Sequence, residues 1–240
     1  MIRTALTFML TFVYIFVVGG PFLLYAVISR RTDALYAVGV LGARLALWLA
    51  GVKMQVIGKE KIPAGQAVIF MPNHQSNSDP PAVFVQLPPV LVMAKKEFFR
   101  VPVLGPSMRL RGFIPVDRKN RERAMEAVEE AVRSLQAGHS FLVFPEGTRS
   151  PDGRLQRFKK GAFLMAVKSG AAIVPVSVSG SRFIMPKGAN ALRPGVIRIA
   201  FHDPVPVEEF GVGRMPELQA RVRQTIASAL TPEEQPLDYA

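Results

Sequence analysis

The first hydrophobic feature of the chain is an uncharged run over residues 4–29, flanked by Arg3 and by Arg30-Arg31. At 1.5 Å per residue, a helix of this length reaches across the roughly 30 Å hydrocarbon core of a bilayer. Gly19-Gly20-Pro21 lies inside the run and is expected to kink or split the helix. No small-residue cleavage site follows a short apolar core, which favours a retained anchor over a removed signal peptide.

A second apolar stretch, residues 34–51, carries Arg44 at its middle. A lone Arg at bilayer depth costs on the order of a few kcal/mol, so this stretch is expected at the membrane interface or against the following domain, with Trp48 at the interface. We therefore predict that residues 1–51 form a two-helix membrane anchor, either one spanning helix plus an interfacial one or a hairpin in one leaflet. A buried core helix is the alternative. Arg30-Arg31 favours the cytoplasmic face of the inner or cell membrane.

From residue 52 onward, short apolar runs alternate with helical periodicity. This alternation predicts an α/β fold, with a mixed, largely parallel sheet flanked by helices, in one domain over residues 52–240. The clearest helix begins at Asn120, ends at Gly138 and has a hydrophobic stripe at helical spacing. Further helices are predicted at 161–169 and 215–230, and the last ten residues are expected to be frayed. The candidate strands are 54–57, 67–71, 90–94, 112–116, 141–144, 173–177 and 196–201.

The charge of the chain favours an acidic partner. The chain has 30 Lys and Arg residues and 18 Asp and Glu residues, which gives a formal net charge of +12. The mean hydropathy is +0.23. Nucleic acid, an anionic membrane surface and acidic small molecules or carriers all suit such a charge. Because the basic residues are dispersed and no aromatic-rich RNA-binding motif is present, nucleic acid is not expected. The chain has no Cys, and its three His lack a metal-binding spacing, so no metal site is expected.

His74 and Asp79 lie in a polar segment directly after the apolar run 67–71. In an α/β sheet, residues just past the carboxyl end of a strand line the usual ligand crevice. Pro80 disfavours an α conformation at Asp79, so both side chains are expected in one loop, where Asp79 can orient His74 as a base. The chain has neither Cys nor a Gly-x-Ser-x-Gly elbow, so the expected nucleophile is a hydroxyl of the substrate. A loop His near a capping Asp is the alternative.

Two further polar segments follow apolar runs. Arg118 comes after 112–116 at a predicted helix start, where a guanidinium can pair with phosphate. Residues 144–150, Phe-Pro-Glu-Gly-Thr-Arg-Ser, place a carboxylate, a hydroxyl and an Arg in one tight loop. That set suits a small ligand with hydroxyls and a phosphate, and a solvated turn is the alternative for each segment.

In this order and at these separations, the segments resemble the glycerolipid acyltransferase family, and more closely its 1-acylglycerol-3-phosphate acyltransferases. Asn73, His74 and Asp79 match the first motif of the family, and residues 112–118 match the second. Residues 144–150 match the third motif letter for letter, and Val-Pro-Val at 174–176 matches the fourth. The resemblance covers roughly residues 50–205.

The resemblance implies a membrane-associated acyltransferase. It implies transfer of a fatty acyl group from an acyl thioester, either acyl-coenzyme A or an acyl carrier protein, to the free hydroxyl of 1-acylglycerol-3-phosphate, giving phosphatidic acid. His74 would deprotonate that hydroxyl, and Asp79 would orient His74. No metal and no cofactor besides the acyl donor is implied, and an anionic membrane surface is an implied partner. The implied substrate-binding residues are Lys95, Arg118, Glu146, Gly147, Thr148 and Arg149.

Two alternatives remain open on the sequence. The acceptor can be glycerol-3-phosphate, another lysophospholipid or a lyso-ornithine lipid, since the motifs do not separate these lipids. The second alternative, from a different functional class, is a basic, membrane-anchored binding protein without catalytic activity. His74 and Asp79, both present, argue against that second alternative.

Overall fold

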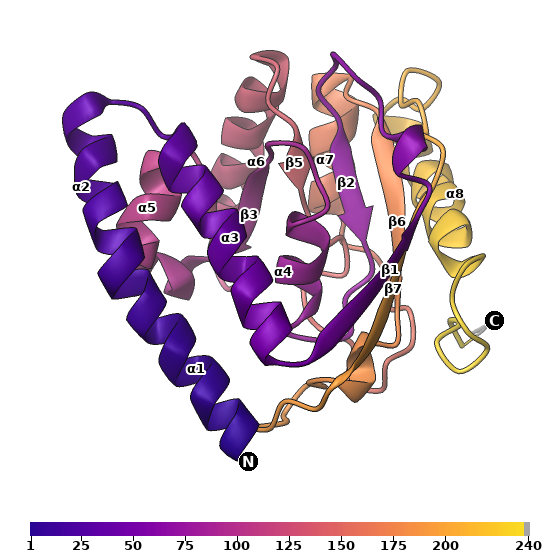
Figure 1. The fold of residues 1–240 in the computed structure, drawn as a ribbon. Coiled ribbons are helices and arrows are strands. Elements are labelled where there is room, and N and C mark those ends of the chain that lie inside the picture. The colour runs from indigo at the N-terminus through magenta and orange to yellow at the C-terminus, as the bar shows by residue number, and fades with distance from the viewer. Residues whose placement is uncertain (238–240) are drawn as a thin grey trace.

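The computed structural model describes residues 1–237, and each predicted strand is present in it (Figure 1). The strands form a seven-stranded sheet in the order β1-β7-β6-β2-β5-β3-β4. The sheet and its flanking helices confirm the predicted α/β fold. The strands are β1 Val52–Ile57, β2 Ile69–Pro72, β3 Leu91–Lys95, β4 Ile114–Val116, β5 Phe141–Leu142, β6 Ile173–Ser179 and β7 Gly195–Phe201.

Neighbouring strands run parallel except for β6 and β7, which are antiparallel. β2 lies in the middle of the sheet, and its Ile69 pairs with Ile173 of β6 and Phe141 of β5. Because β6, β2, β5, β3 and β4 point the same way, their carboxyl ends meet at one edge of the sheet. The polar segments that follow β2, β3, β4 and β5 are therefore brought to that edge, as the general rule for such sheets predicts.

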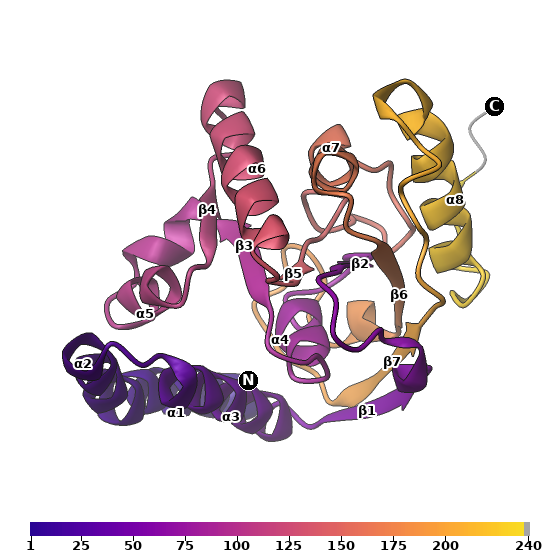
Figure 2. The ribbon, with the colours of Figure 1, turned by 90° about the horizontal axis from the view of Figure 1, so that it is seen from above.

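Helices cover both faces of the sheet (Figure 2). α6, α7 and α8 lie on one face, and α3 and α4 on the other. The α-helices that follow the N-terminal segment are α3 Asp33–Leu49, α4 Asp79–Phe84, α5 Leu104–Leu110, α6 Arg121–Gln136, α7 Lys160–Ser169 and α8 Met215–Ala227. Short 3-10 helices are η2 Lys59–Lys61, η3 Lys96–Arg100, η4 Ser181–Phe183 and η5 Val212–Arg214.

Side chains of β2 alternate between two hydrophobic cores. Ile69 and Met71 pack in the core beneath α6, α7 and α8, whereas Phe70 packs in the core shared with α3 and α4. A central strand that is apolar on both faces is typical of parallel sheets with helices on each side. Burial on both faces fixes the position of β2, and with it the point where the polar segment after β2 begins.

The predicted helix after Asn120 is confirmed as α6. The Asn120 side chain accepts a hydrogen bond from the Arg123 backbone N–H at 3.0 Å, which is a standard N-cap. Gly138 follows the helix with a φ of 92°, a left-handed conformation that favours Gly. Ala127, Val128, Ala131, Val132 and Leu135 form its buried stripe, whereas Met125, one turn before Val128, is exposed.

The N-terminal apolar run forms one joined helix and is not split. α1 (Ile2–Tyr14), a π-helical turn η1 (Ile15–Gly19) and α2 (Gly20–Ser29) are continuous. The wider π turn directly precedes α2, whose second residue, Pro21, lacks the N–H that would otherwise continue the α-helical hydrogen bonding. This joined helix has 28 residues, and its most apolar 18-residue window has a mean hydropathy of 2.1, with only 11% of that window buried.

One helix of the described residues, rather than two, is long and apolar enough to cross a membrane. The second predicted anchor helix, α3, packs on the domain. Tyr14 donates a hydrogen bond to the Val38 carbonyl at 2.9 Å, which joins α1 to α3, and Leu47 and Ala50 belong to the core beneath the sheet. The domain boundary near residue 52 stays a prediction.

The C-terminal residues are more ordered than expected. α8 ends at Ala227, and the segment that follows folds back onto the end of β6, where Glu234 is 1% exposed and accepts a hydrogen bond from the Ser179 hydroxyl at 2.6 Å. The prediction of a frayed end is therefore wrong for residues 231–237, because a buried carboxylate fixes them. Residues 238–240 of that prediction lie outside the described residues.

Candidate active site

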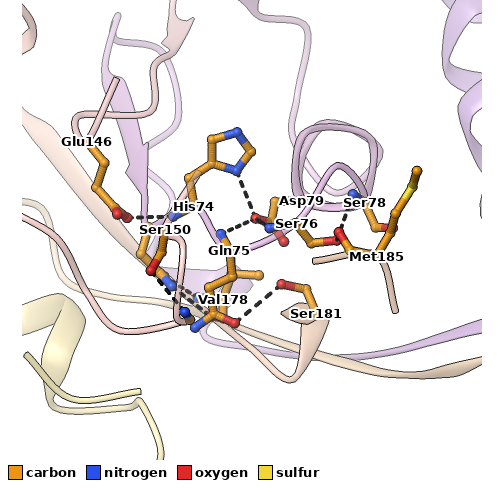
Figure 3. Close-up of polar contacts among 12 residues, drawn as sticks. His74, Gln75, Ser76, Ser78, Asp79, Glu146, Ser150, Val178, Ser181 and Met185 are labelled. Carbon is orange, nitrogen blue, oxygen red and sulfur yellow. Dashed lines mark hydrogen bonds and ion pairs between the residues drawn. The ribbon is translucent and has the colours of Figure 1, made fainter. Parts of the chain in front are cut away.

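The polar segment after β2 is buried at the carboxyl edge of the sheet. Asn73 and Asp79 are fully buried, and His74 is 9% exposed. The His74 Nδ1 lies 2.9 Å from Asp79 Oδ2 (Figure 3), so the structure brings the two predicted catalytic side chains into direct contact.

Asp79 is fixed by the backbone that surrounds it. The same Oδ2 atom accepts hydrogen bonds from the backbone N–H groups of Gln75 at 2.6 Å and Ser76 at 2.7 Å. Asp79 is the first residue of α4 and not a loop residue. Pro80 and Pro81 are tolerated there because the first helical turn needs no N–H from them, and they do not exclude Asp79 from the helix.

The contact with Asp79 determines which nitrogen of His74 can act as a base. A carboxylate only accepts hydrogen bonds, so the shared proton lies on Nδ1 and the lone pair lies on Nε2. Figure 3 shows the second ring nitrogen pointing away from Asp79. The Phe144 ring lies against the imidazole, with 4.4 Å between ring centroids. His74 is therefore held in the tautomer that leaves the lone pair of Nε2 free to accept a proton.

The backbone of His74 is held from the loop after β5. Its N–H donates to Glu146 Oε1 at 2.6 Å, and its carbonyl accepts from the Ser150 N–H at 2.8 Å. The preceding residue, Asn73, pairs through its side-chain amide with both the N–H and the carbonyl of Val178, at 2.7 and 2.8 Å. These bonds join the end of β2 to the loop after β5 and to β6.

Glu146 does not face an open surface, in contrast to the predicted role in acceptor binding. The side chain is 2% exposed, and its second oxygen accepts from the Gln156 N–H at 3.3 Å. Burial raises the pKa of the Glu146 carboxyl to about 8, and the nearby Asp79 carboxylate adds to the rise. In the structure Glu146 holds the His74 backbone, and its binding of the acceptor stays a prediction.

Gly147, Thr148 and Arg149 form the turn next to Glu146. Gly147 has a φ of 69°, a left-handed conformation that few other residues adopt. Thr148 is exposed and Arg149 is half-buried. Within residues 1–237, the Arg149 guanidinium has no ion-pair partner.

The predicted cation Lys95 is the last residue of β3, and Arg118 lies in the turn after β4. The Lys95 Nζ is 3.6 Å from Glu97 Oε1, and Glu97 is also the acidic group that interacts with Arg118. Lys96 forms an ion pair with Asp117 at 2.6 Å, which ties the two strand ends together. Lys95 and Arg118 thus share one exposed basic region, although no contact within the described residues joins them to His74.

Sequence reasoning gave no role to several residues that build the site. Gln156 and Ser150 contact the His74–Glu146 unit through backbone groups, which no side-chain pattern reveals. Ser76 Oγ donates to the Met185 carbonyl at 2.9 Å and accepts from the Ser78 N–H at 3.1 Å. Since its hydroxyl is engaged away from Nε2, Ser76 is not placed as a nucleophile.

Comparisons with known proteins point to the family that the sequence motifs resemble. The sequence model of the Acyltransferase family matches residues 53–179, more than half of the chain. A 1-acyl-sn-glycerol-3-phosphate acyltransferase of Chlamydomonas reinhardtii is 35% identical over 183 residues, 75% of this chain and 54% of that protein. A protein of the same name from Limnanthes alba is 33% identical over 197 residues, 80% of this chain and 69% of that protein.

The chain spans about half the length of several curated relatives that it matches. Among solved structures, the crystal structure of the 1-acyl-sn-glycerophosphate (LPA) acyltransferase PlsC from Thermotoga maritima is 30% identical, with a TM-score of 0.82. The match covers 94% of this chain and 92% of that one. These findings confirm the resemblance of the motifs, and the chain belongs to the Acyltransferase family.

Proposed function

We propose that this protein transfers a fatty acyl group from an acyl thioester to the free hydroxyl of 1-acylglycerol-3-phosphate, giving phosphatidic acid. The observation that carries this proposal is the His74–Asp79 contact of 2.9 Å, which leaves Nε2 as the base. The names of the relatives from Chlamydomonas reinhardtii and Limnanthes alba support the same acceptor.

The reaction needs no protein nucleophile. His74 Nε2 takes the proton of the acceptor hydroxyl while the oxygen of that hydroxyl attacks the thioester carbonyl carbon. The tetrahedral intermediate then collapses, the carbon–sulfur bond breaks, and the leaving thiolate takes the proton from the imidazolium. Asp79 stabilises the imidazolium between these two transfers.

The basic side chains at the carboxyl edge suit the phosphate of the acceptor. Lys95 and Arg118 share one exposed region, and Arg149 lies in the turn three residues after the buried Glu146. A guanidinium binds a phosphate bidentately, and an ammonium binds it as a point charge. We propose that these three cations bind the phosphate, with Gly147 and Thr148 lining the glycerol. Apart from the thioester donor, the proposal includes no cofactor and no metal.

The N-terminal helices supply the contact with the lipid phase in this proposal. The joined α1–α2 helix exposes large apolar side chains along its length, among them Phe8, Phe12, Leu24 and Ile28. An acceptor with one acyl chain is a membrane lipid, so the site must lie close to a bilayer. The net charge of +12 suits anionic head groups at the cytoplasmic face and an acidic acyl donor.

The acceptor and the donor are tested with purified protein in detergent and product analysis by mass spectrometry. The acceptors are 1-acylglycerol-3-phosphate, glycerol-3-phosphate, a lysophospholipid with a larger head group, and lyso-ornithine lipid. Each is offered acyl-coenzyme A or, separately, acyl carrier protein thioester. We expect phosphatidic acid as the dominant product. Preferred acylation of any other acceptor would overturn the substrate assignment and retain the mechanism, whereas no product with any pair would overturn the proposed activity.

A further inference from the structure

Glu234 is a buried carboxylate in the loop after α8, outside the residues that match the family. Its Oε2 accepts hydrogen bonds from the Ser179 hydroxyl at 2.6 Å and the Thr231 N–H at 3.2 Å. Its Oε1 accepts from the Gly180 N–H at 2.9 Å. A carboxylate with this many donors is strongly fixed, because hydrogen bonds to a charged acceptor are stronger than neutral ones.

One chain of contacts leads from Glu234 to the N–H of His74. The Glu234 carbonyl accepts from the Leu155 N–H at 3.0 Å. The next residue, Gln156, donates its N–H to Glu146 Oε2 at 3.3 Å, and Glu146 Oε1 accepts from the His74 N–H at 2.6 Å. Glu234 therefore fixes the segment that orients the Glu146 carboxyl.

A second chain of contacts reaches the residue before His74. Glu234 binds the last residue of β6, Ser179, and the one after it, Gly180. Val178, one residue earlier, pairs with the Asn73 side chain through both its backbone groups. Gly180 has a φ of 82°, and a Cβ there would lie 2.6 Å from the Val196 carbonyl oxygen. The end of β6 is thus confined on one side by β7 and on the other by Glu234.

We propose that Glu234 is a positioning residue for His74, acting through Glu146 on one side and through Asn73 on the other. The catalytic part of this inference rests on the proposed acyl transfer. Both backbone neighbourhoods of the base converge on one residue: the Glu234 side chain holds the end of β6, and the same hydrogen bonds fix the Glu234 backbone carbonyl that accepts from Leu155. A displacement of the base by a fraction of an ångström lowers the rate of the chemical step and leaves the substrate-binding cations in place.

Kinetics of Glu234→Ala, with Glu233→Ala as the matched control, test the inference. Glu233 is the adjacent Glu and is exposed, so its loss is expected to leave the rate unchanged. Glu234→Ala is expected to lower kcat by about tenfold or more, with KM for acceptor and donor within about twofold of wild type. Glu234→Gln is expected to restore most of kcat, because its amide oxygen still accepts from Gly180 and its NH2 group can donate to the Ser179 hydroxyl.

Ser179→Ala extends the test and covers the case in which Glu234→Ala does not fold. It removes one donor to Glu234 and is expected to lower kcat partially. The double variant is expected to be no worse than Glu234→Ala alone, because both changes act through the same contact. Additive losses in the double variant, or a wild-type kcat in both single variants, would overturn the inference.

Hydrogen exchange of the full chain in detergent gives a readout that does not depend on activity. In Glu234→Ala, faster exchange is expected at the amides of His74 and Gln156, with the exchange of α6 unchanged. If the wild-type protein transfers no acyl group, the proposed function fails while this local change still supports the structural part. Exchange that rises throughout the sheet, or at none of these amides, would show that Glu234 does not position the base.

Discussion

At the scale of single residues, buried carboxylates organise the site. Asp79 accepts from the His74 ring and from two backbone N–H groups through one oxygen. Glu146 accepts from the His74 backbone instead of the ring. The two side chains have different consequences: Asp79 fixes the tautomer of the His74 ring, and Glu146 fixes the position of the His74 backbone.

The buried Glu146 carboxyl makes stability depend on pH. Burial raises its folded-state pKa from 4.5 to about 8, so between these values the folded protein holds a proton that the unfolded chain has lost. The free energy of unfolding therefore falls as pH rises from 4.5 to about 8. We expect Glu146→Gln to flatten this decline, measured by urea unfolding at a series of pH values. Equal slopes in the two proteins would contradict this account of the side chain.

Sequence motifs identified the residues of the site more successfully than their orientation. His74 and Asp79 were placed together because both lie in one short polar segment directly after a buried strand, where the ligand crevice of an α/β sheet usually lies. The burial of Glu146 was not foreseen, since nothing in residues 144–150 shows that its carboxyl group turns inward. The contacts of Gln156 and Glu234 were not foreseen at all, because they depend on backbone groups distant in the sequence.

At the scale of elements, η3 begins directly after Lys95, one cation of the proposed phosphate site, and packs against α5. The turn between them is strained: Val103 has a φ of 63°, which is rare for a β-branched residue, and Leu104 donates to the Pro102 carbonyl at 2.7 Å. The Phe99 carbonyl of η3 accepts from Arg109 of α5 at 2.7 Å. This close packing joins α5 to the segment that carries Lys96 and Glu97.

Gly105 lies at the closest approach of α5 to η3. A Cβ at this position would be 2.3 Å from the Phe99 carbonyl oxygen, which is a backbone atom and cannot rotate away. We expect Gly105→Ala to destabilise the protein by about 2 kcal/mol, lowering the Tm by about 4–8 °C. In Gly39→Ala, the control, the added methyl group has no atom within 4 Å. Equal Tm values for the two variants in thermal unfolding would contradict this account of the packing at Gly105.

The hydrophobic pattern of the sequence predicts the strands and helices closely, but it does not predict their irregularities. The strands and α6 match short apolar runs and a capped helical stripe. The N-terminal helix was expected to kink or split at Gly19-Gly20-Pro21, and the π turn keeps it joined. A π turn leaves no period in the sequence, because it changes the hydrogen bonding of five residues without changing which side chains are apolar.

At the scale of the whole molecule, the joined α1–α2 helix gives the protein one strongly apolar side. The helix lies along α3, away from α8 (Figures 1 and 2). Only 11% of its most apolar window is buried. Exposed apolar surface of this extent on one side suits contact with a lipid phase, and the exposed Trp48 of α3 suits the interface.

Vesicle flotation tests the proposed membrane contact. The double variant Phe12→Asp with Ile28→Asp puts two charges on the exposed side of α1–α2. We expect it to lower binding to phosphatidylglycerol-containing vesicles by about tenfold or more, because charged side chains enter hydrocarbon poorly. The control is Val212→Asp in η5, which is 60% exposed and distant in the chain. Equal binding by both variants would place the membrane contact elsewhere.

The central claim is that His74 is the base of an acyl transfer, and one rate comparison tests it most directly. Wild-type protein and His74→Ala are assayed for phosphatidic acid formation from 1-acylglycerol-3-phosphate, with each of the two thioester donors. The account predicts product from wild type and a loss on the order of a hundredfold or more in the variant, as expected when a general base is removed. Full activity in a folded His74→Ala protein would contradict the mechanism, whatever the product.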